Sequence, residues 1–157
     1  MNFNTMEMKD LYCRKIKTPL GELVAMASQE YLYFLQFGDK EGLEQMIDDF
    51  ALSLPAAWQH GDNIILNQLQ TELDVPYGST HTYKQIAQAV ANPKAMRAVG
   101  HANGLNRILL IVPCHRIVGE QNSPTGYSAG IWRKNWLIEH ESRFVTMLKA
   151  KVEILKE

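Results

Sequence analysis

The sequence predicts a mixed α+β fold in which a small antiparallel sheet precedes a mainly helical part. Two short runs of strand-forming residues, Leu23 to Met26 and Leu32 to Phe37, are flanked by TPLG and SQE, which are typical of hairpin turns. Later, EGLEQMIDDFALSL and NIILNQLQTEL carry apolar residues at helical spacing. A chain of 157 residues suits one compact domain or two small ones.

The composition narrows the class of protein. The chain is 46% apolar, and its longest apolar runs fall far short of the roughly 18 residues that span a bilayer, so we expect a soluble protein without a membrane partner. The first ten residues lack the apolar segment of a secretory signal, which predicts an intracellular protein, in the cytoplasm or the nucleus. Cys13 and Cys114 are too few and too far apart for a disulfide framework or a structural zinc site, so we expect free thiols, no metal and no cofactor.

The charges are distributed unevenly along the chain. Residues 1–74 carry 12 acids and 5 bases, whereas residues 75–119 carry 5 bases and no acid. Residues 120–157 carry 6 bases and 5 acids. The basic block indicates a polyanionic partner, and a solvated basic face beside an acidic domain is the alternative.

Two short helices are predicted within this basic block. Thr82 is a suitable cap for a helix from Tyr83 to about Val90. The ANP sequence that follows ends this helix and places Pro93 at the first position of a second one, which stops at Gly104. A tight turn between two short helices is the layout of a helix-turn-helix, whose second helix meets DNA, although many such pairs bind nothing.

The second helix is rich in small residues, and Arg97 is its one long cation after Lys94. A smooth helix with a single arginine suits the minor groove, because base reading in the major groove needs several long polar side chains. Tight packing against neighbouring helices explains the small residues equally well. These small residues are Ala95, Ala98, Gly100, Ala102 and Gly104.

A cysteine follows the most apolar run of the chain. Ile108 to Val112 predicts a buried central strand that Pro113 ends, so Cys114 is expected where the strand enters a loop. Its neighbours His115 and Arg116 are candidates for a base and a cation that favour the nucleophilic thiolate. A buried structural cysteine is the alternative.

Several motifs together resemble one family. VPYGSTHTY, NPKAMRAVGHANGLN, PCHRIVG and TGYSAGIWRKNWLIEHE, in this order, are similar to those of the O6-alkylguanine-DNA alkyltransferases, also called methylated-DNA-protein-cysteine methyltransferases. The resemblance implies a ribonuclease-H-like α/β domain at residues 1–65 and a winged-helix-like domain with the helix-turn-helix and active site at residues 66–157. It also implies a monomer that binds double-stranded DNA containing O6-alkylguanine, with no metal.

The resemblance further implies a direct, irreversible repair reaction in which the alkyl group moves from the flipped-out guanine to the protein. By motif position, Cys114 is the acceptor, and His115 is the base that acts through a bridging water. Glu141 orients His115, and Tyr83 donates a proton to the leaving guanine. A helix-end glutamate on the surface and a core tyrosine are the alternatives for the last two.

The same motifs assign contacts with DNA. Arg97 matches the arginine that fills the gap left by the flipped nucleotide, and Lys94, Met96 and Ala98 lie on the same helix. Three further residues match the site itself: Asn106 braces the turn before the active-site segment, and Tyr127 and Ser128 form a wall of the base pocket.

The sequence departs from the family pattern at two places, and two other functions are alternatives to repair. The family commonly has a phenylalanine and a Val-Trp pair where this chain has NIILNQLQTEL, and His101 lies on the helix that approaches DNA. A sensor that binds alkylated guanine without repairing it requires an inert Cys114. A cysteine hydrolase unrelated to DNA has no need of Arg97.

We expect the C-terminal apolar residues Phe144, Met147, Leu148 and Leu155 to pack on the core.

Overall fold

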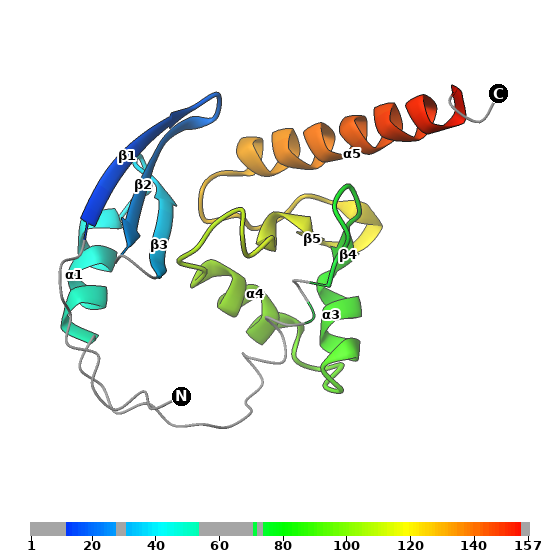
Figure 1. Cartoon of the computed structure of the whole chain (residues 1–157). Helices are drawn as coiled ribbons and strands as arrows, with labels where there is room; N and C mark the ends of the chain where they lie inside the picture. Colours follow the sequence, from blue (N-terminus) through cyan, green and yellow to red (C-terminus); the bar gives the residue numbers. More distant parts are fainter. Residues whose placement is uncertain (1–11, 28–30, 54–70, 72–73, 155–157) are drawn as a thin grey trace, which may run out of the picture. The chain divides into compact units, whose positions relative to one another are not determined.

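The computed structural model describes residues 12–27, 31–53, 71 and 74–154, and the chain divides into two compact units, Met1–Asp62 and Asn63–Glu157 (Figure 1). Each unit has its own secondary structure. The predicted helix within NIILNQLQTEL lies outside the described residues, apart from Thr71. No helix in the described ranges is both long and apolar enough to cross a membrane.

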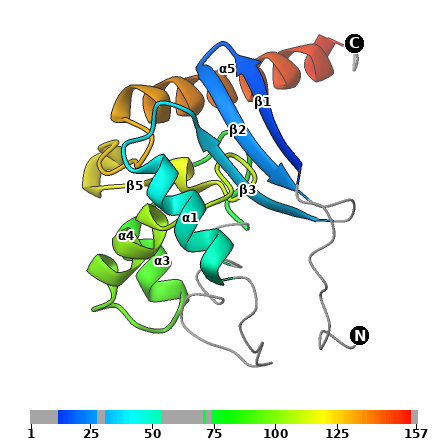
Figure 2. The same ribbon diagram turned by 90° about the vertical axis from the view of Figure 1, so that its left-hand side faces the viewer.

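The first unit holds a three-stranded antiparallel sheet in the order β1-β2-β3. Its strands are β1 (Tyr12–Thr18), β2 (Gly21–Ala27) and β3 (Leu32–Phe37). The TPLG hairpin is confirmed, since Thr18 pairs with Gly21 across it. Helix α1 (Leu43–Ser53) lies beside the sheet (Figure 2), where its apolar face packs on Met26 and Phe34. The mixed α+β class predicted from sequence is confirmed.

Within residues 74–154, the second unit combines helices with a very small parallel sheet. The helices are α3 (Tyr83–Ala89), α4 (Met96–Gly104) and α5 (Ile131–Ile154). Strand β4 (His81–Thr82) pairs in parallel with β5 (Ile117–Val118), and two 3-10 turns, η1 (Cys114–Arg116) and η2 (Glu120–Asn122), flank β5. The β4–β5 pair therefore ties the start of α3 to the residues immediately after Cys114.

The predicted helix pair is present, with one boundary moved. Thr82 caps α3, as predicted, and the structure adds a capping box with Gln85. Helix α3 packs against α4 around Ile86 and Val99. The second helix does not begin at Pro93. The Ala95 N–H donates to the Asn92 carbonyl, which closes a turn over Pro93, and the first helical bond joins Val99 to Ala95.

The prediction of a central strand from Ile108 to Val112 is wrong. Leu110 has a φ of 72°, in the left-handed region, and the Val112 N–H donates 3.0 Å to the Ile108 carbonyl, so the segment folds back as a turn. Leu109 is buried, whereas Ile111 is 59% exposed. A turn that buries only some of its apolar side chains and a short buried strand have the same pattern in sequence.

Helix α5 confirms the helix predicted within GIWRKNWLIEHE and continues far beyond it. The expectation that its C-terminal apolar residues pack on the core is wrong for the described ones. Phe144, Met147 and Leu148 are exposed, and Leu155 lies outside the described residues. Its buried side chains lie instead in its first three turns, where they face the segment around Cys114. These are Arg133, Lys134, Leu137 and Glu141.

Candidate active site

The thiol of Cys114 lies at the start of η1 and is 2% exposed. The amide of Asn106 braces it by donating to the Cys114 Sγ at 3.0 Å and to the Val112 carbonyl at 3.0 Å. The Asn106 Oδ1 in turn accepts from the Ile108 N–H at 2.9 Å, so Asn106 connects the end of α4 to both sides of the turn. A donor on sulfur favours the thiolate, because hydrogen bonds to a charged acceptor are the stronger ones.

His115 and Glu141 form a buried pair, with 2.9 Å between the His115 Nε2 and the Glu141 Oε1. Burial alone raises the pKa of Glu141, but hydrogen bonds from His115, Arg116 and Gly78 outweigh burial and lower the pKa to about 2. Glu141 is therefore a carboxylate that accepts from Nε2. The proton of a neutral His115 thus lies on Nε2, and the buried, unpartnered Nδ1 is the atom that accepts a proton.

Glu141 is held in place by more than His115. Arg116 donates to both of its oxygens, with Nε 3.0 Å from Oε2 and Nη2 3.1 Å from Oε1. The third Arg116 nitrogen, Nη1, donates to the Val75 carbonyl at 2.8 Å. The Gly78 N–H adds a bond of 3.0 Å. Glu141 is 5% exposed, so the alternative of a surface glutamate at a helix end is wrong.

A cavity of about 310 Å³ opens onto the sulfur. Two of its polar groups, the Tyr127 hydroxyl and the Ser128 hydroxyl, are buried without a hydrogen-bond partner. Burial, and then the negative charge of Cys114, raise the pKa of Tyr127 above its usual range, so its hydroxyl stays a donor. The cavity thus offers unsatisfied hydrogen-bonding groups to a polar ligand beside the Cys114 thiol. It is lined by Gly100, Asn103, Gly104, Cys114, Gly126, Tyr127 and Ser128.

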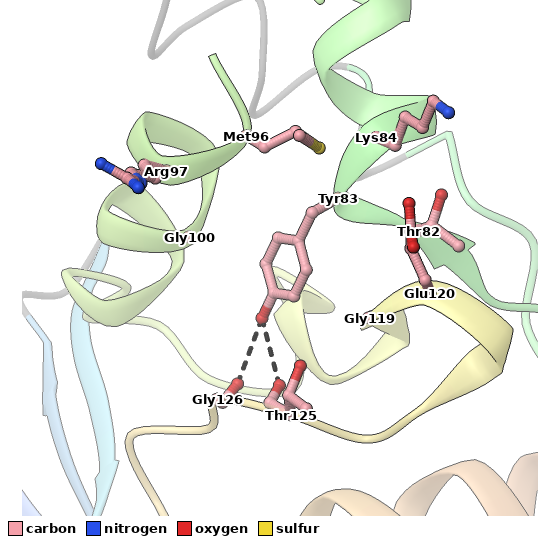
Figure 3. Close-up of a pocket in the computed structure, with 10 residues that line it drawn as sticks. All are labelled: Thr82, Tyr83, Lys84, Met96, Arg97, Gly100, Gly119, Glu120, Thr125 and Gly126. Carbon is pink, nitrogen blue, oxygen red and sulfur yellow. Dashed lines mark hydrogen bonds between the residues drawn. The ribbon is translucent and has the colours of Figure 1, made fainter. Parts of the chain in front are cut away.

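Tyr83 lines a second, neighbouring cavity of about 480 Å³ (Figure 3). Its hydroxyl lies 3.2 Å from the Thr125 carbonyl and 3.3 Å from the Gly126 carbonyl. Gly100 and Gly126 belong to both cavities, so the phenol stands at the wall they share and not inside the cavity of Cys114. The remaining lining residues are Thr82, Lys84, Met96, Arg97, Gly119, Glu120 and Thr125.

Lys134, on helix α5, holds the wall between the two cavities in place. Its ammonium is fully buried and donates to three carbonyls, those of Ile117 at 2.5 Å, Thr125 at 2.7 Å and Gly126 at 3.2 Å. Two of these carbonyls are the ones that the Tyr83 hydroxyl reaches, and the ammonium lies 5.6 Å from the centre of the Tyr83 ring. Burial lowers the pKa of Lys134 to about 8.

The residues predicted to contact DNA are gathered at the start of α4. Lys94, Met96, Arg97 and Ala98 are all exposed, and the Arg97 guanidinium points away from the helix in Figure 3. They lie next to the two cavities, since Met96 and Arg97 line the second one. Within the described parts of the chain, no three histidine, cysteine or acidic side chains come together as metal ligands do.

Sequence analysis did not identify Asn103 and Lys134 as residues of this site. It also did not predict that Arg116 binds both Glu141 and the Val75 carbonyl. Lys134, Leu137 and Glu141 are spaced by three and four residues, which places them on one face of a helix. That spacing was a usable signal that Lys134 faces the same way as Glu141. The bond from Arg116 to Val75 spans 41 residues and had no local signal.

A helix-turn-helix beside a buried cysteine with a histidine and glutamate pair defines a DNA-binding protein class that acts through a thiol nucleophile. Residues 66–143 match the family model described as 6-O-methylguanine DNA methyltransferase, DNA binding domain. A methylated-DNA–protein-cysteine methyltransferase of Mycobacterium leprae is 32% identical over 159 residues, which cover 86% of this chain and 94% of that protein. The chain belongs to the methylated-DNA–protein-cysteine methyltransferase family.

Other relatives match over a shorter length. A probable methylated-DNA–protein-cysteine methyltransferase of Acanthamoeba polyphaga mimivirus is 51% identical over 71 residues, which are 45% of this chain and 47% of that protein. The match to the Shigella flexneri enzyme spans 39% of its length. Among solved structures, Mycobacterium tuberculosis O6-methylguanine methyltransferase has a TM-score of 0.66 at 29% identity and covers 85% of this chain and 94% of its own. The Mycobacterium tuberculosis OGT in complex with DNA has a TM-score of 0.67 at 30% identity, covering 83% and 92%.

Proposed function

We propose that this protein repairs DNA directly by moving the alkyl group of O6-alkylguanine, in double-stranded DNA, onto Cys114. The observation that carries the proposal is the convergence of three features on one sulfur. The Asn106 amide donates to it, a cavity with unsatisfied hydroxyls opens onto it, and the adjacent His115 is paired with Glu141. A DNA substrate places the protein inside the cell.

The proton balance follows from the hydrogen bonds around His115. The Nδ1 takes the thiol proton of Cys114 through a bridging water, and Glu141 stabilises the imidazolium that forms. The thiolate then attacks the alkyl carbon, so that an S–C bond forms while the C–O6 bond breaks and its electron pair stays with guanine. Tyr83, whose hydroxyl stands at the wall between the two cavities, donates a proton to a ring nitrogen of the leaving base once its hydroxyl turns from the Thr125 and Gly126 carbonyls toward the bound base.

The product explains why the protein acts once. A thioether of Cys114 has no thiol proton left to lose, and a thiolate is a poor leaving group from a neutral thioether, so neither water nor the hydroxyls of Tyr127 and Ser128 in the cavity regenerate the free cysteine. We propose the Tyr127 and Ser128 hydroxyls as the groups that hydrogen-bond the flipped base, since each gains the partner it lacks.

We further propose that α4 enters the minor groove and that Arg97 fills the space left by the extruded nucleotide. Lys94, Met96 and Ala98 then lie against the DNA backbone and groove walls. In this arrangement residues 66–157 hold the DNA-binding and catalytic functions, and residues 1–65 form the separate α/β domain.

Intact mass tests the proposal. The protein is incubated with a duplex that contains one O6-methylguanine, alongside the Cys114→Ala variant. The expected result is one added methyl group per chain, saturating at one equivalent and absent in the variant. An unchanged mass with lesion-selective binding intact identifies a sensor. Continued turnover beyond one equivalent identifies a true catalyst and contradicts the proposal.

A further inference from the structure

One acidic residue lies within a long and otherwise basic stretch of the chain. Between Asp74 and Glu139 the sequence contains seven bases and one acid, Glu120. Three of these bases, Arg116, Arg133 and Lys134, have side chains that are largely buried. The exposed ones are Lys84, Lys94, Arg97 and Arg107. Glu120 is therefore the one anionic side chain among the exposed charged side chains of this stretch.

Glu120 lies beside the cationic side chains that are suited to binding an anion. It lines the second cavity together with Lys84 and Arg97, and Figure 3 shows its side chain extending beside Thr82. It is exposed, and the described residues offer its carboxylate no hydrogen bond or ion pair. Its negative charge is thus left uncompensated by any direct contact.

The turn around Glu120 holds this position. The Gly119 N–H donates to the Ser123 carbonyl at 2.7 Å, and the Ser123 N–H donates to the Glu120 carbonyl at 3.1 Å. The next two residues, Gln121 and Asn122, both have a φ of 56°, in the left-handed region. A short closed turn of this kind keeps the Glu120 backbone from moving away from the cavity.

The cavity of Glu120 adjoins the one that opens onto Cys114, because Gly100 and Gly126 line both. A nucleotide whose base enters the Cys114 cavity keeps its sugar and phosphates outside it. The backbone of the bound DNA therefore passes the opening that Glu120 lines. A carboxylate at that opening repels phosphates, whereas Arg97 and Lys84 attract them.

We propose that Glu120 limits the affinity of this protein for undamaged DNA by repelling the phosphates of the bound backbone. This proposal rests on the function proposed above. Binding to undamaged DNA depends on phosphate contacts, so a repelling charge weakens it directly. A lesion complex experiences the same repulsion but also gains the short-range contacts of the base in the Cys114 cavity, so it tolerates the loss of affinity better than undamaged DNA does. Glu120 thereby reduces the fraction of protein held on undamaged sites.

The test compares Glu120→Gln with wild type in fluorescence-anisotropy titrations of an undamaged labelled duplex, from low to high salt. The expected result at low salt is roughly threefold to tenfold tighter binding by the variant, with the gain shrinking as salt screens the charge. Glu120→Ala gives the same gain, which separates lost repulsion from a new hydrogen bond donated by the glutamine amide. The matched control is Glu139→Gln, which removes the same charge from the exposed face of α5 and leaves the affinity unchanged.

Equal affinities of Glu120→Gln and wild type overturn the proposal, and so does an equal gain in Glu139→Gln, which points to net charge and not to position. A gain that persists at high salt also overturns it. Methyl transfer by the wild-type protein is measured in parallel. If wild type transfers the methyl group and Glu120→Gln binds no tighter, only this inference fails. If wild type neither binds the duplex nor transfers the group, the proposed function fails.

Discussion

Replacing Glu141 by glutamine removes the charge at the centre of the buried cluster while keeping the shape of the side chain. In the wild-type protein the carboxylate accepts hydrogen bonds from His115, Arg116 and Gly78. A glutamine has one acceptor oxygen and turns an NH₂ group toward the other donors. At least one buried donor is then left without a partner, and the charge of Arg116 loses its counter-ion.

The magnitude follows from the pKa of Glu141, which falls from an ordinary 4.5 to about 2 in the folded protein. Because the folded pKa lies below the unfolded one, the carboxylate stabilises the fold above about pH 5, and this stabilisation is lost as the pH falls toward 2. A depression of this size corresponds to roughly 3 kcal/mol of unfolding free energy at pH 7, of which about half is gone by pH 3.

Urea unfolding followed by tryptophan fluorescence, at a series of pH values from 7 down to 2, measures the effect. Glu141→Gln is expected to be about 3 kcal/mol less stable than wild type at pH 7, with the gap closing as the pH approaches 2. Glu139→Gln, on the exposed face of the same helix, changes stability by less than about 0.5 kcal/mol at every pH. A gap between Glu141→Gln and wild type that stays constant with pH refutes the reasoning, because a lost packing contact does not titrate.

Two further predictions concern the groups that position the thiol and the phenol. Lys134→Met removes the ammonium from which the carbonyls of Ile117, Thr125 and Gly126 accept, and the Tyr83 hydroxyl reaches only the last two. We therefore expect a loss of about 3 kcal/mol in urea unfolding and slower methyl transfer, and unchanged stability contradicts the role of Lys134 in holding this wall. Asn106→Leu removes the donor to the Cys114 sulfur, so alkylation of Cys114 by iodoacetamide at neutral pH is expected to slow by about tenfold, and an unchanged rate contradicts thiolate stabilisation by Asn106.

The local features of the fold could be predicted from the sequence because short-range chemistry determines them. Thr82 and Gln85 form the capping box that starts α3, and the TPLG turn closes the first hairpin. The prediction of a strand from Ile108 to Val112 failed for a physical reason. An apolar run indicates burial but not backbone direction, and nothing in the sequence signals the left-handed φ of Leu110.

The candidate site could be predicted only in part. Periodicity placed Glu141 on a helix, but 26 residues separate it from His115, and their contact was inferred from the family resemblance alone. The clamp from Arg116 to Val75 and the three carbonyls on Lys134 depend on how distant segments pack, which no local pattern encodes. Long-range contacts between polar side chains are thus the part of the site that needed a structure.

The central claim is that Cys114, and no other thiol, receives the alkyl group. Trypsin cleaves after Arg107 and Arg116 and so isolates residues 108–116, which contain Cys114, whereas the exposed Cys13 falls in residues 10–14. Tandem mass spectrometry of this digest, after reaction with a duplex containing one O6-methylguanine, is the most direct measurement. The expected result is a methyl group on Cys114 in residues 108–116 and none on Cys13. A methyl group on Cys13, or loss of the lesion with neither cysteine modified, contradicts it.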